Sequence, residues 1–226
     1  VHPALISMND EYLSRIPNFL VVGKTGSGKS YALSVLLGIY AKYTNADITI
    51  CDYKKSSFSQ FENMPNFYGY TDVPNGIRTI YKEFCERVKE NDDERNRHIK
   101  VLLIDEYGAL ISAQDKKAAD ELKTMVGNML FMGRSLGIRV LIGIQRADAE
   151  YFKSGARDQF CAILALGKLS KEQKQMLFSD CKEKMTNRLG TGEGYLLIDE
   201  RDIERVKVAE IKDFNALNDS IRKAMH

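Results

Sequence analysis

Residues 23–30 read Gly-Lys-Thr-Gly-Ser-Gly-Lys-Ser, which satisfies the phosphate-binding pattern G-x-x-x-x-G-K-[ST]. In such a loop the glycines let backbone N–H groups curve around a phosphate, because a side chain would block the close approach. Lys29 is expected to reach the β- and γ-phosphates, and the Ser30 hydroxyl is expected to ligate Mg²⁺. The string therefore predicts that the chain binds a nucleoside triphosphate.

The context of this string supports the prediction. An apolar run at 18–22 precedes it and a helical pattern at 29–42 follows it, so a strand, a loop and a helix N-terminus meet at the phosphates. ATP with Mg²⁺ is the expected ligand. The residues expected to surround it are consecutive: Gly23, Lys24, Thr25, Gly26, Ser27, Gly28, Lys29, Ser30 and Tyr31.

A pair of carboxylates follows a second apolar run. Residues 101–104 are Val-Leu-Leu-Ile, and they lead directly into Asp105 and Glu106. At the end of a buried strand beside a phosphate loop, Asp105 can hold Mg²⁺ through its water shell. Glu106 can then polarise the attacking water. The adjacent glutamate favours a mechanical ATPase over a kinase or a small GTPase.

Two further strand ends carry polar residues. The apolar run at 138–144 ends in Gln145, which can hydrogen-bond both the γ-phosphate and the nucleophilic water and so sense hydrolysis. The run at 46–52 ends in Asp52. Lys54 follows it, and the spacing leaves open whether this lysine lies near the nucleotide, a neighbouring subunit or solvent.

The elements that must position these residues alternate along the chain. Short runs rich in Val, Ile and Leu predict strands at 18–22, 46–52, 99–104, 138–144, 160–166 and 194–198. Between them we expect helices at 29–42, 76–90, 115–136 and 170–178. Near-continuous apolar strands are typical of sheets buried on both faces. The pattern therefore predicts an α/β fold with one central, mostly parallel sheet flanked by helices.

The length and composition of the chain constrain its fold and its partners. With 226 residues, 44% of them hydrophobic, it can bury a substantial core, and a net charge of +2 argues neither for nor against nucleic acid. The four cysteines lack metal-ligand spacing and are expected to be free thiols. Free thiols fit a reducing compartment. We expect an N-terminal segment at 1–17, a motor domain at 18–200 and a polar, partly helical tail at 201–226. The first residue is Val1, so we expect a piece of a longer protein.

These residues resemble the motor domain of the FtsK/SpoIIIE DNA translocases, within the FtsK–HerA group of P-loop ATPases. The matching segments in chain order are Gly-Lys-Thr-Gly-Ser-Gly-Lys-Ser at 23–30, Ile-Cys-Asp-Tyr-Lys at 50–54, Leu-Leu-Ile-Asp-Glu-Tyr-Gly-Ala-Leu at 102–110, Gly-Arg-Ser-Leu-Gly-Ile-Arg-Val-Leu-Ile-Gly-Ile-Gln-Arg at 133–146, Ala-Leu-Gly-Lys at 165–168 and Gly-Glu-Gly-Tyr-Leu at 192–196. Together they cover roughly 18–200. The Gly-Arg-x-x-Gly-Ile segment that leads to Gln145 is the most specific part.

The resemblance implies a RecA-like ATPase that moves along double-stranded DNA as a homo-oligomeric ring, a hexamer. It assigns phosphate and Mg²⁺ to Lys29 and Ser30, and further support of Mg²⁺ to Asp105. It makes Glu106 the catalytic carboxylate and Gln145 the sensor.

In such rings an arginine from the neighbouring subunit stabilises the charge on the transferred phosphate. Arg134 and Arg157 are the candidates for this role. Two stretches are candidates for contacts with DNA phosphates, at 114–117 and at 146–157.

The sequence also departs from the family pattern. Tyr53 and Ala147 stand where the family has proline, and nothing after Ile203 resembles the DNA-reading winged helix of chromosome-segregating members. This favours a compact plasmid or conjugative motor that delivers DNA to a relaxase or transfer channel, although a role in chromosome segregation stays open. Alternatives are a type VII-like secretion ATPase that moves proteins and a nucleotide-regulated recruitment module. We expect a cytoplasmic domain, tethered to the membrane only through regions absent from this sequence.

Overall fold

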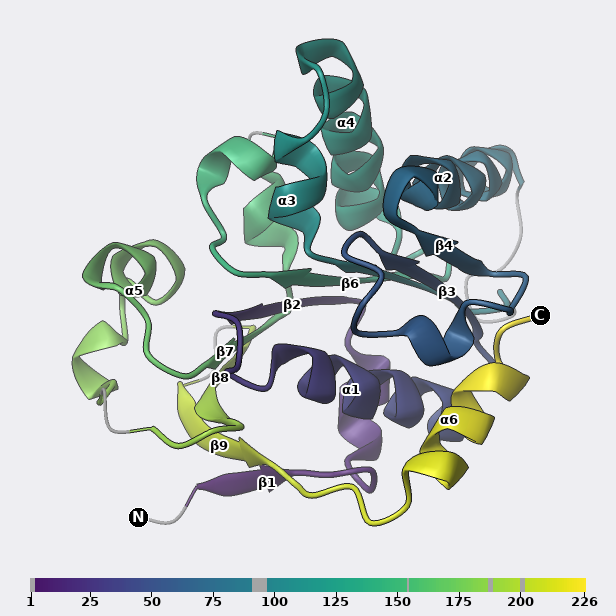
Figure 1. Cartoon of the computed structure of the whole chain (residues 1–226). Helices are drawn as coiled ribbons and strands as arrows, with labels where there is room; N and C mark the ends of the chain where they lie inside the picture. Colours follow the sequence, from purple (N-terminus) through teal and green to yellow (C-terminus); the bar gives the residue numbers. More distant parts are fainter. Residues whose placement is uncertain (1–2, 91–96, 154, 187–188, 200–201) are drawn as a thin grey trace.

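A sheet with helices on both faces runs through the molecule in the computed structural model, which describes residues 3–90, 97–153, 155–186, 189–199 and 202–226 (Figure 1). Its strands are β1 (Ala4–Ile6), β2 (Asn18–Gly23), β3 (Asp47–Asp52), β4 (Phe67–Gly69), β5 (Lys100–Asp105), β6 (Ile138–Ile144), β7 (Ala162–Leu166), β8 (Glu193–Ile198) and β9 (Glu204–Val208). Their order across the sheet is β1-β9-β8-β7-β2-β6-β5-β3-β4. Only the pairs that include β8 are antiparallel among the described strands. The prediction of a mostly parallel α/β fold is confirmed.

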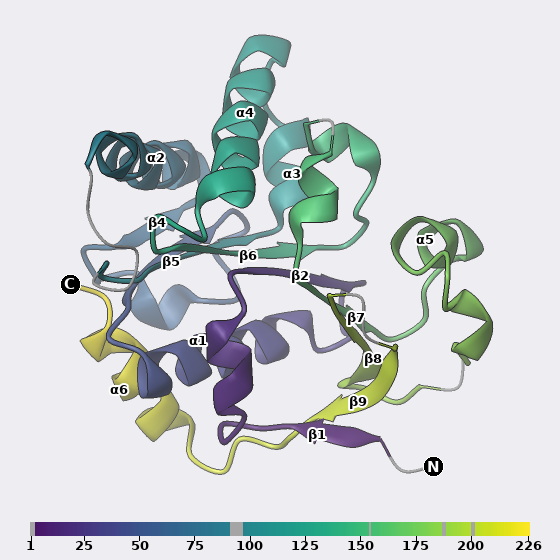
Figure 2. The same cartoon turned by 180° about the vertical axis from the view of Figure 1, so that it is seen from behind.

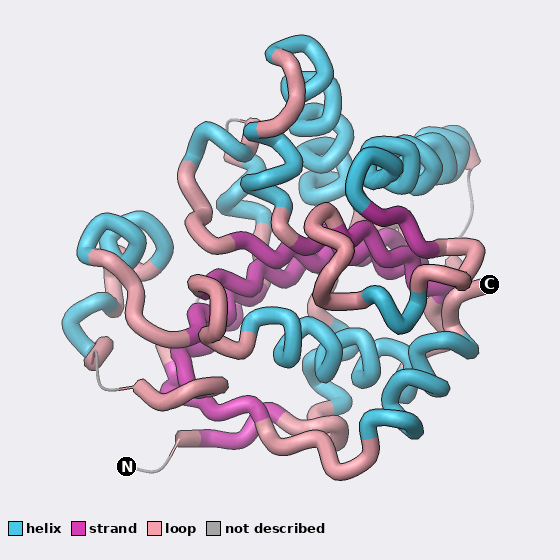
Figure 3. The backbone as a smooth tube through the Cα atoms, in the orientation of Figure 1, coloured by secondary structure: helices cyan, strands magenta, loops and turns pink. Residues whose placement is uncertain are grey.

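The helices form one layer on each face of the sheet. They are α1 (Lys29–Tyr43), α2 (Val73–Lys89), α3 (Tyr107–Ser112), α4 (Lys116–Met132), α5 (Lys171–Leu177) and α6 (Phe214–Lys223). Helices α1 and α6 cover one face, and α2, α3 and α4 cover the other (Figure 2). Helix α5 lies beyond β7 and β8, to one side of the two layers (Figure 3).

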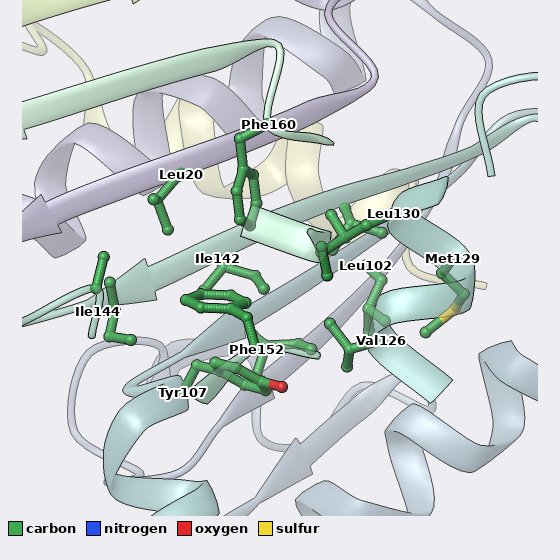
Figure 4. Packing of buried hydrophobic residues seen from close by; sticks show 14 of the residues in the cluster. Leu20, Leu102, Tyr107, Val126, Met129, Leu130, Ile142, Ile144, Phe152 and Phe160 are labelled. Atoms are coloured by element: carbon green, nitrogen blue, oxygen red, sulfur yellow. The ribbon is translucent and has the colours of Figure 1, made fainter. Parts of the chain in front are cut away.

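Strand β2 shows why the central strands are almost entirely apolar. Phe19 and Val21 pack in the cluster beneath α1, whereas Leu20 and Val22 pack in the cluster beneath α4. Successive side chains of a strand point to opposite faces, so a strand covered on both sides needs apolar residues throughout. All four are fully buried. Figure 4 shows the cluster on the α4 side, which includes Leu20 and Ile142 from the sheet and Val126 and Met129 from α4.

The sequence missed four of the described strands and α-helices. Strands β1 and β4 have three residues each, too few for a periodic signal, and α3 begins directly after the strand that carries Asp105. Strand β9 lies within the tail expected to be polar, and it pairs in parallel with β1 of the N-terminal segment. Both flanking segments thus contribute to the same sheet. The division of the chain at residues 18 and 200 stays a prediction.

Some predicted boundaries also shift. The helix expected over 115–136 ends at Met132, because a turn over Gly133 to Gly137 leads into β6. Gly137 takes a φ of 71°, a left-handed conformation that suits glycine. The strand expected over 160–166 begins at Ala162, after a short 3-10 helix.

Candidate nucleotide and catalytic site

The sheet brings the predicted site residues to one edge. Strands β2, β6, β5 and β3 are parallel neighbours, so their carboxyl ends lie side by side. Val22 is in register with Ile144, which places the start of the phosphate loop beside Gln145. Asp52 is in register with Asp105 on β5. Residues far apart in sequence therefore meet at the carboxyl edge, where open α/β sheets bind ligands.

The loop between β2 and α1 has the backbone that phosphate binding requires. Gly26 and Gly28 take left-handed φ values of 81° and 95°. A Cβ on Gly23 would lie 2.3 Å from the Ser27 Oγ and 3.3 Å from the carbonyl oxygen of Leu166, so a side chain here would require Ser27 to move. Gly28 is also the N-cap of α1, whose free N–H groups open toward the loop. This cradle fits a phosphate at the positive end of a helix.

The β7–β8 side of the sheet closes against the same loop. The N–H of Gly192 donates to the carbonyl of Ser27 at 3.2 Å. A Cβ on Gly28 would lie 3.3 Å from the Cα of Gly192, and one on Gly167 would lie 3.4 Å from the Cβ of Ser27. Three backbones pack together here with glycine at each contact. The phosphate loop is thereby fixed by the end of the sheet that sequence spacing did not connect to it.

Lys29 is buried against both predicted carboxylates. Its Nζ lies 2.5 Å from Asp105 Oδ1 and 3.0 Å from Glu106 Oε1. Burial alone would lower the pKa of Lys29, but the two carboxylates outweigh it and hold that pKa above its usual value. The cluster is therefore a satisfied set of buried charges at the first turn of α1.

Glu106 contacts the tips of two other strands as well. Its Oε2 lies 3.1 Å from Lys54 Nζ and accepts a hydrogen bond of 3.1 Å from Gln145 Nε2. Glu106 itself takes a left-handed φ of 58°, which turns the chain sharply from β5 into α3. Burial would raise the pKa of Glu106, but Lys29 and Lys54 together hold it below the usual value. The carboxyl is thus kept ionised.

Ser30 and Asp105 offer the hard oxygen ligands that Mg²⁺ prefers. The Ser30 Oγ lies 3.5 Å from Asp105 Oδ2 and 2.9 Å from the Ser57 Oγ. The described residues contain no cluster of three or more His, Cys, Asp or Glu side chains suited to a metal. One hydroxyl and one carboxylate fit a cation that takes its remaining ligands from water and nucleotide phosphates, as Mg²⁺ usually does.

The loop after β3 makes two contacts with the site: one by Lys54, whose surroundings the sequence left open, and one by Ser57, which the sequence did not indicate. Asp52 is fully buried and accepts 3.0 Å hydrogen bonds from the backbone N–H groups of Lys55, Ser57 and Phe58. Burial raises the pKa of Asp52 despite these donors. The loop so formed brings Lys54 to Glu106 and Ser57 to Ser30. No motif marks a serine at this spacing.

Gly143 is a further residue of the site that sequence reasoning missed. It lies on β6, between the phosphate-loop strand and the Asp105 strand. A Cβ at this position would lie 2.3 Å from Asp105 Oδ1 and 2.7 Å from Leu33 Cδ1. A lone glycine within an apolar strand pattern is the available signal, since it often marks a close approach.

Tyr31, which was predicted to lie beside the nucleotide, contacts the C-terminal part of the chain. The Tyr31 hydroxyl donates to the carbonyl of Ala209 at 3.2 Å and accepts from the N–H of Ile211, and its ring meets Phe214 edge-on at 5.9 Å. Tyr31 therefore holds the segment that precedes α6. Its predicted contact with the nucleotide stays a prediction.

The two candidate arginines lie just before strands rather than after them. Arg134 is exposed in the turn that leads into β6, at the end of that strand opposite Gln145. Arg157 lies in the 3-10 helix before β7, and its guanidinium donates to the carbonyl of Ala147 at 3.4 Å. The structure does not bring either arginine into the Lys29 cluster of the same chain.

Two broader expectations can be compared with the structure. All four cysteines are free thiols; Cys51 is buried and Cys161 is half-buried. None of the helices in the described ranges has the length and apolar character needed to cross a bilayer.

The sequence profile of the FtsK/SpoIIIE family matches residues 6–186, which is most of the chain. The chain belongs to this family. It is 28% identical over 196 residues to the FtsK domain-containing protein YdcQ of Bacillus subtilis, covering 80% of this chain and 40% of YdcQ. It is 23% identical over 164 residues to the DNA translocase FtsK of Campylobacter jejuni, covering 61% of this chain and 17% of that protein. The chain thus spans less than half the length of these FtsK-family relatives.

Solved structures confirm the fold. The conjugation coupling protein TcpA of pCW3, in a monomer form with ATPγS, superposes with a TM-score of 0.74 at 20% identity, covering 93% of this chain and 66% of TcpA. The cytoplasmic domain of the type VII secretion ATPase EccC from Thermomonospora curvata gives 0.68 at 18% identity, covering 92% of this chain and 28% of EccC. Family membership together with this shared fold identifies the chain as a P-loop ATPase domain of the FtsK/SpoIIIE family.

Proposed function

We propose that this FtsK/SpoIIIE-family ATPase domain hydrolyses ATP to move double-stranded DNA. The observation that carries the proposal is the buried cluster at the carboxyl edge, where Glu106 lies 3.0 Å from Lys29 and 3.1 Å from Gln145. A carboxylate next to the phosphate-binding lysine and to a strand-end amide is suited to polarising a water for in-line attack.

Each residue of the cluster has a defined part in this reaction. The loop backbone and Lys29 bind the phosphates, and Glu106 accepts a hydrogen bond, and then a proton, from the attacking water. Ser30 and Asp105 would hold Mg²⁺, which when bound neutralises charge on the β- and γ-phosphates. Gln145 couples the state of Glu106 to the loop that follows β6.

Two surfaces are proposed to contact DNA phosphates. Lys116 and Lys117 are exposed at the start of α4, and Lys153 is exposed in the connection between β6 and β7. In that second stretch Arg146 is also exposed, in an ion pair with Asp148 at 3.2 Å; Ser154, within the same stretch, lies outside the described residues. Such contacts are independent of base sequence, as a motor that passes along DNA requires.

We further propose that the active form is a homo-oligomeric ring, with a hexamer as the expected size, in which Arg134 or Arg157 reaches the nucleotide of a neighbouring copy. Plasmid or conjugative transfer is the proposed setting, with a relaxase or transfer-channel protein receiving the DNA. The similarity to the coupling protein TcpA supports this setting. The domain would act in the cytoplasm, and any membrane tether would come from regions outside this sequence.

The test is ATPase activity measured with and without double-stranded DNA of mixed sequence. We expect DNA to stimulate turnover several-fold in the wild type and to leave the Lys29→Ala variant inactive. The similarity to EccC favours a second candidate, an ATPase that moves proteins. Stimulation by a secreted-protein signal peptide and not by DNA would favour that candidate. Slow turnover that responds to neither would indicate a recruitment module.

A further inference from the structure

The two oxygens of the Glu106 carboxylate have different kinds of partner. Oε1 contacts Lys29, which is the residue of the phosphate loop that reaches for a nucleotide. Oε2 contacts Lys54 and Gln145, each at 3.1 Å, and neither belongs to the phosphate loop. One oxygen is thus paired with a side chain that serves the phosphates, and the other with two strand-end side chains.

The position of Lys54 is fixed by the buried Asp52. Its own side chain is 44% exposed, so the ion pair with Glu106 is partly screened and would be weak on an otherwise mobile loop. The backbone around it is held by Asp52, which accepts hydrogen bonds from the N–H groups of residues 55, 57 and 58. Tyr53, on the other side of Lys54, packs against Tyr70 with ring centroids 5.6 Å apart. The loop is therefore built to present Lys54 at one place.

We propose that Lys54 is a positioning residue that, together with Gln145, holds Oε2 of Glu106 so that Oε1 is aimed at the attacking water once Lys29 engages the phosphates. The proposal rests on the ATP hydrolysis part of the proposed function and is independent of DNA. Two donors on one oxygen restrict rotation of the carboxylate, and a catalytic group held in its productive geometry reacts faster than one that samples many orientations.

The experiment compares Lys54→Met, Lys54→Arg and Lys55→Met without DNA. Lys55 is the matched control, because it lies in the same loop but pairs with Glu62 at 3.2 Å, away from the site. We expect Lys54→Met to lower kcat by about 10- to 100-fold with little change in ATP affinity. Lys54→Arg should retain most of the activity and the ATP affinity of the wild type, and Lys55→Met should match the wild type.

Wild-type kcat in Lys54→Met would overturn the proposal, and so would a loss of activity explained by weaker ATP binding. A higher rate would also overturn it, since Lys54 would then restrain the site. Failure of DNA to stimulate the wild type would overturn the motor alone.

Discussion

The two ends of β6 present opposite environments. At the carboxyl end, Gln145 joins a cluster in which Lys29, Asp105 and Glu106 are buried and paired with one another. At the amino end, Arg134 is exposed in the turn that precedes the strand. The same strand therefore ends on one side in a satisfied charge network and begins on the other beside an exposed cation.

The carboxyl-end cluster is therefore assembled within one chain, whereas the exposed Arg134 lies away from it. Phosphate loop, carboxylates and strand-end amide come together within a single copy, because parallel strands place their carboxyl ends together. No arginine of the described chain is part of that cluster by hydrogen bond or ion pair. We therefore propose that a guanidinium that stabilises the transferred phosphate comes from Arg134 or Arg157 of a second copy.

The largest effect is expected from Lys29→Ala, at the carboxyl end. The substitution removes the cation that binds the phosphates, so ATP turnover should be lost and binding of a fluorescent ATP analogue should fall at least 100-fold. It also leaves two buried carboxylates without their cation, so a thermal melt must confirm that the variant is folded. Substantial turnover in a folded variant would contradict the role of the loop.

The next largest effect is expected at the amino ends of β6 and β7, where Arg134 and Arg157 lie. If Arg157 or Arg134 acts in trans, its substitution by alanine should lower the rate by about 10³-fold, the size of an arginine-finger effect. Inactive subunits mixed into wild type should depress its activity beyond simple dilution. Arg78→Ala serves as a control, because this exposed arginine of α2 pairs with Glu121 of α4 at 3.0 Å. Wild-type rates in both single variants would mean that each site works without either arginine.

Glu106→Gln should have a somewhat smaller effect. The amide keeps the shape of the carboxylate but cannot accept a proton, so hydrolysis should fall by about 10²- to 10³-fold while ATP stays bound. Equilibrium binding and single-turnover rates measure the two properties separately. Normal turnover in this variant would refute the assigned role, whereas loss of binding would indicate a part in holding the nucleotide.

The smallest effect is expected from Asp52→Asn, which tests how the carboxyl edge is built. An amide offers one acceptor oxygen where the carboxylate offers two, so at least one buried N–H of the loop loses its partner, at a cost of about 1–3 kcal/mol. Urea unfolding should therefore show a lower free energy of unfolding than in the wild type. The exposed Asp219→Asn should leave it unchanged. Equal stability of both variants would mean that the loop does not depend on Asp52.

Several parts of the site could be predicted from the sequence because they are local. The loop at 23–30 needs consecutive residues, and Asp105, Glu106 and Gln145 directly follow apolar runs that only strands explain. The central strands could be predicted from their continuous apolar runs, because a strand buried on both faces needs apolar residues throughout. Short edge strands such as β1 and β4 gave no such signal, because three residues carry no periodicity.

The contacts between these local pieces were decided by the tertiary structure alone. Whether Lys54 meets Glu106 depends on β3 lying beside β5 and on the buried Asp52 that winds the loop. Gly143 matters only because β6 separates the phosphate loop from Asp105. Sequence spacing specifies what a strand end carries, whereas strand order specifies which ends become neighbours. The sequence by itself thus determined the nucleotide chemistry, and the sheet determined which side chains act on it together.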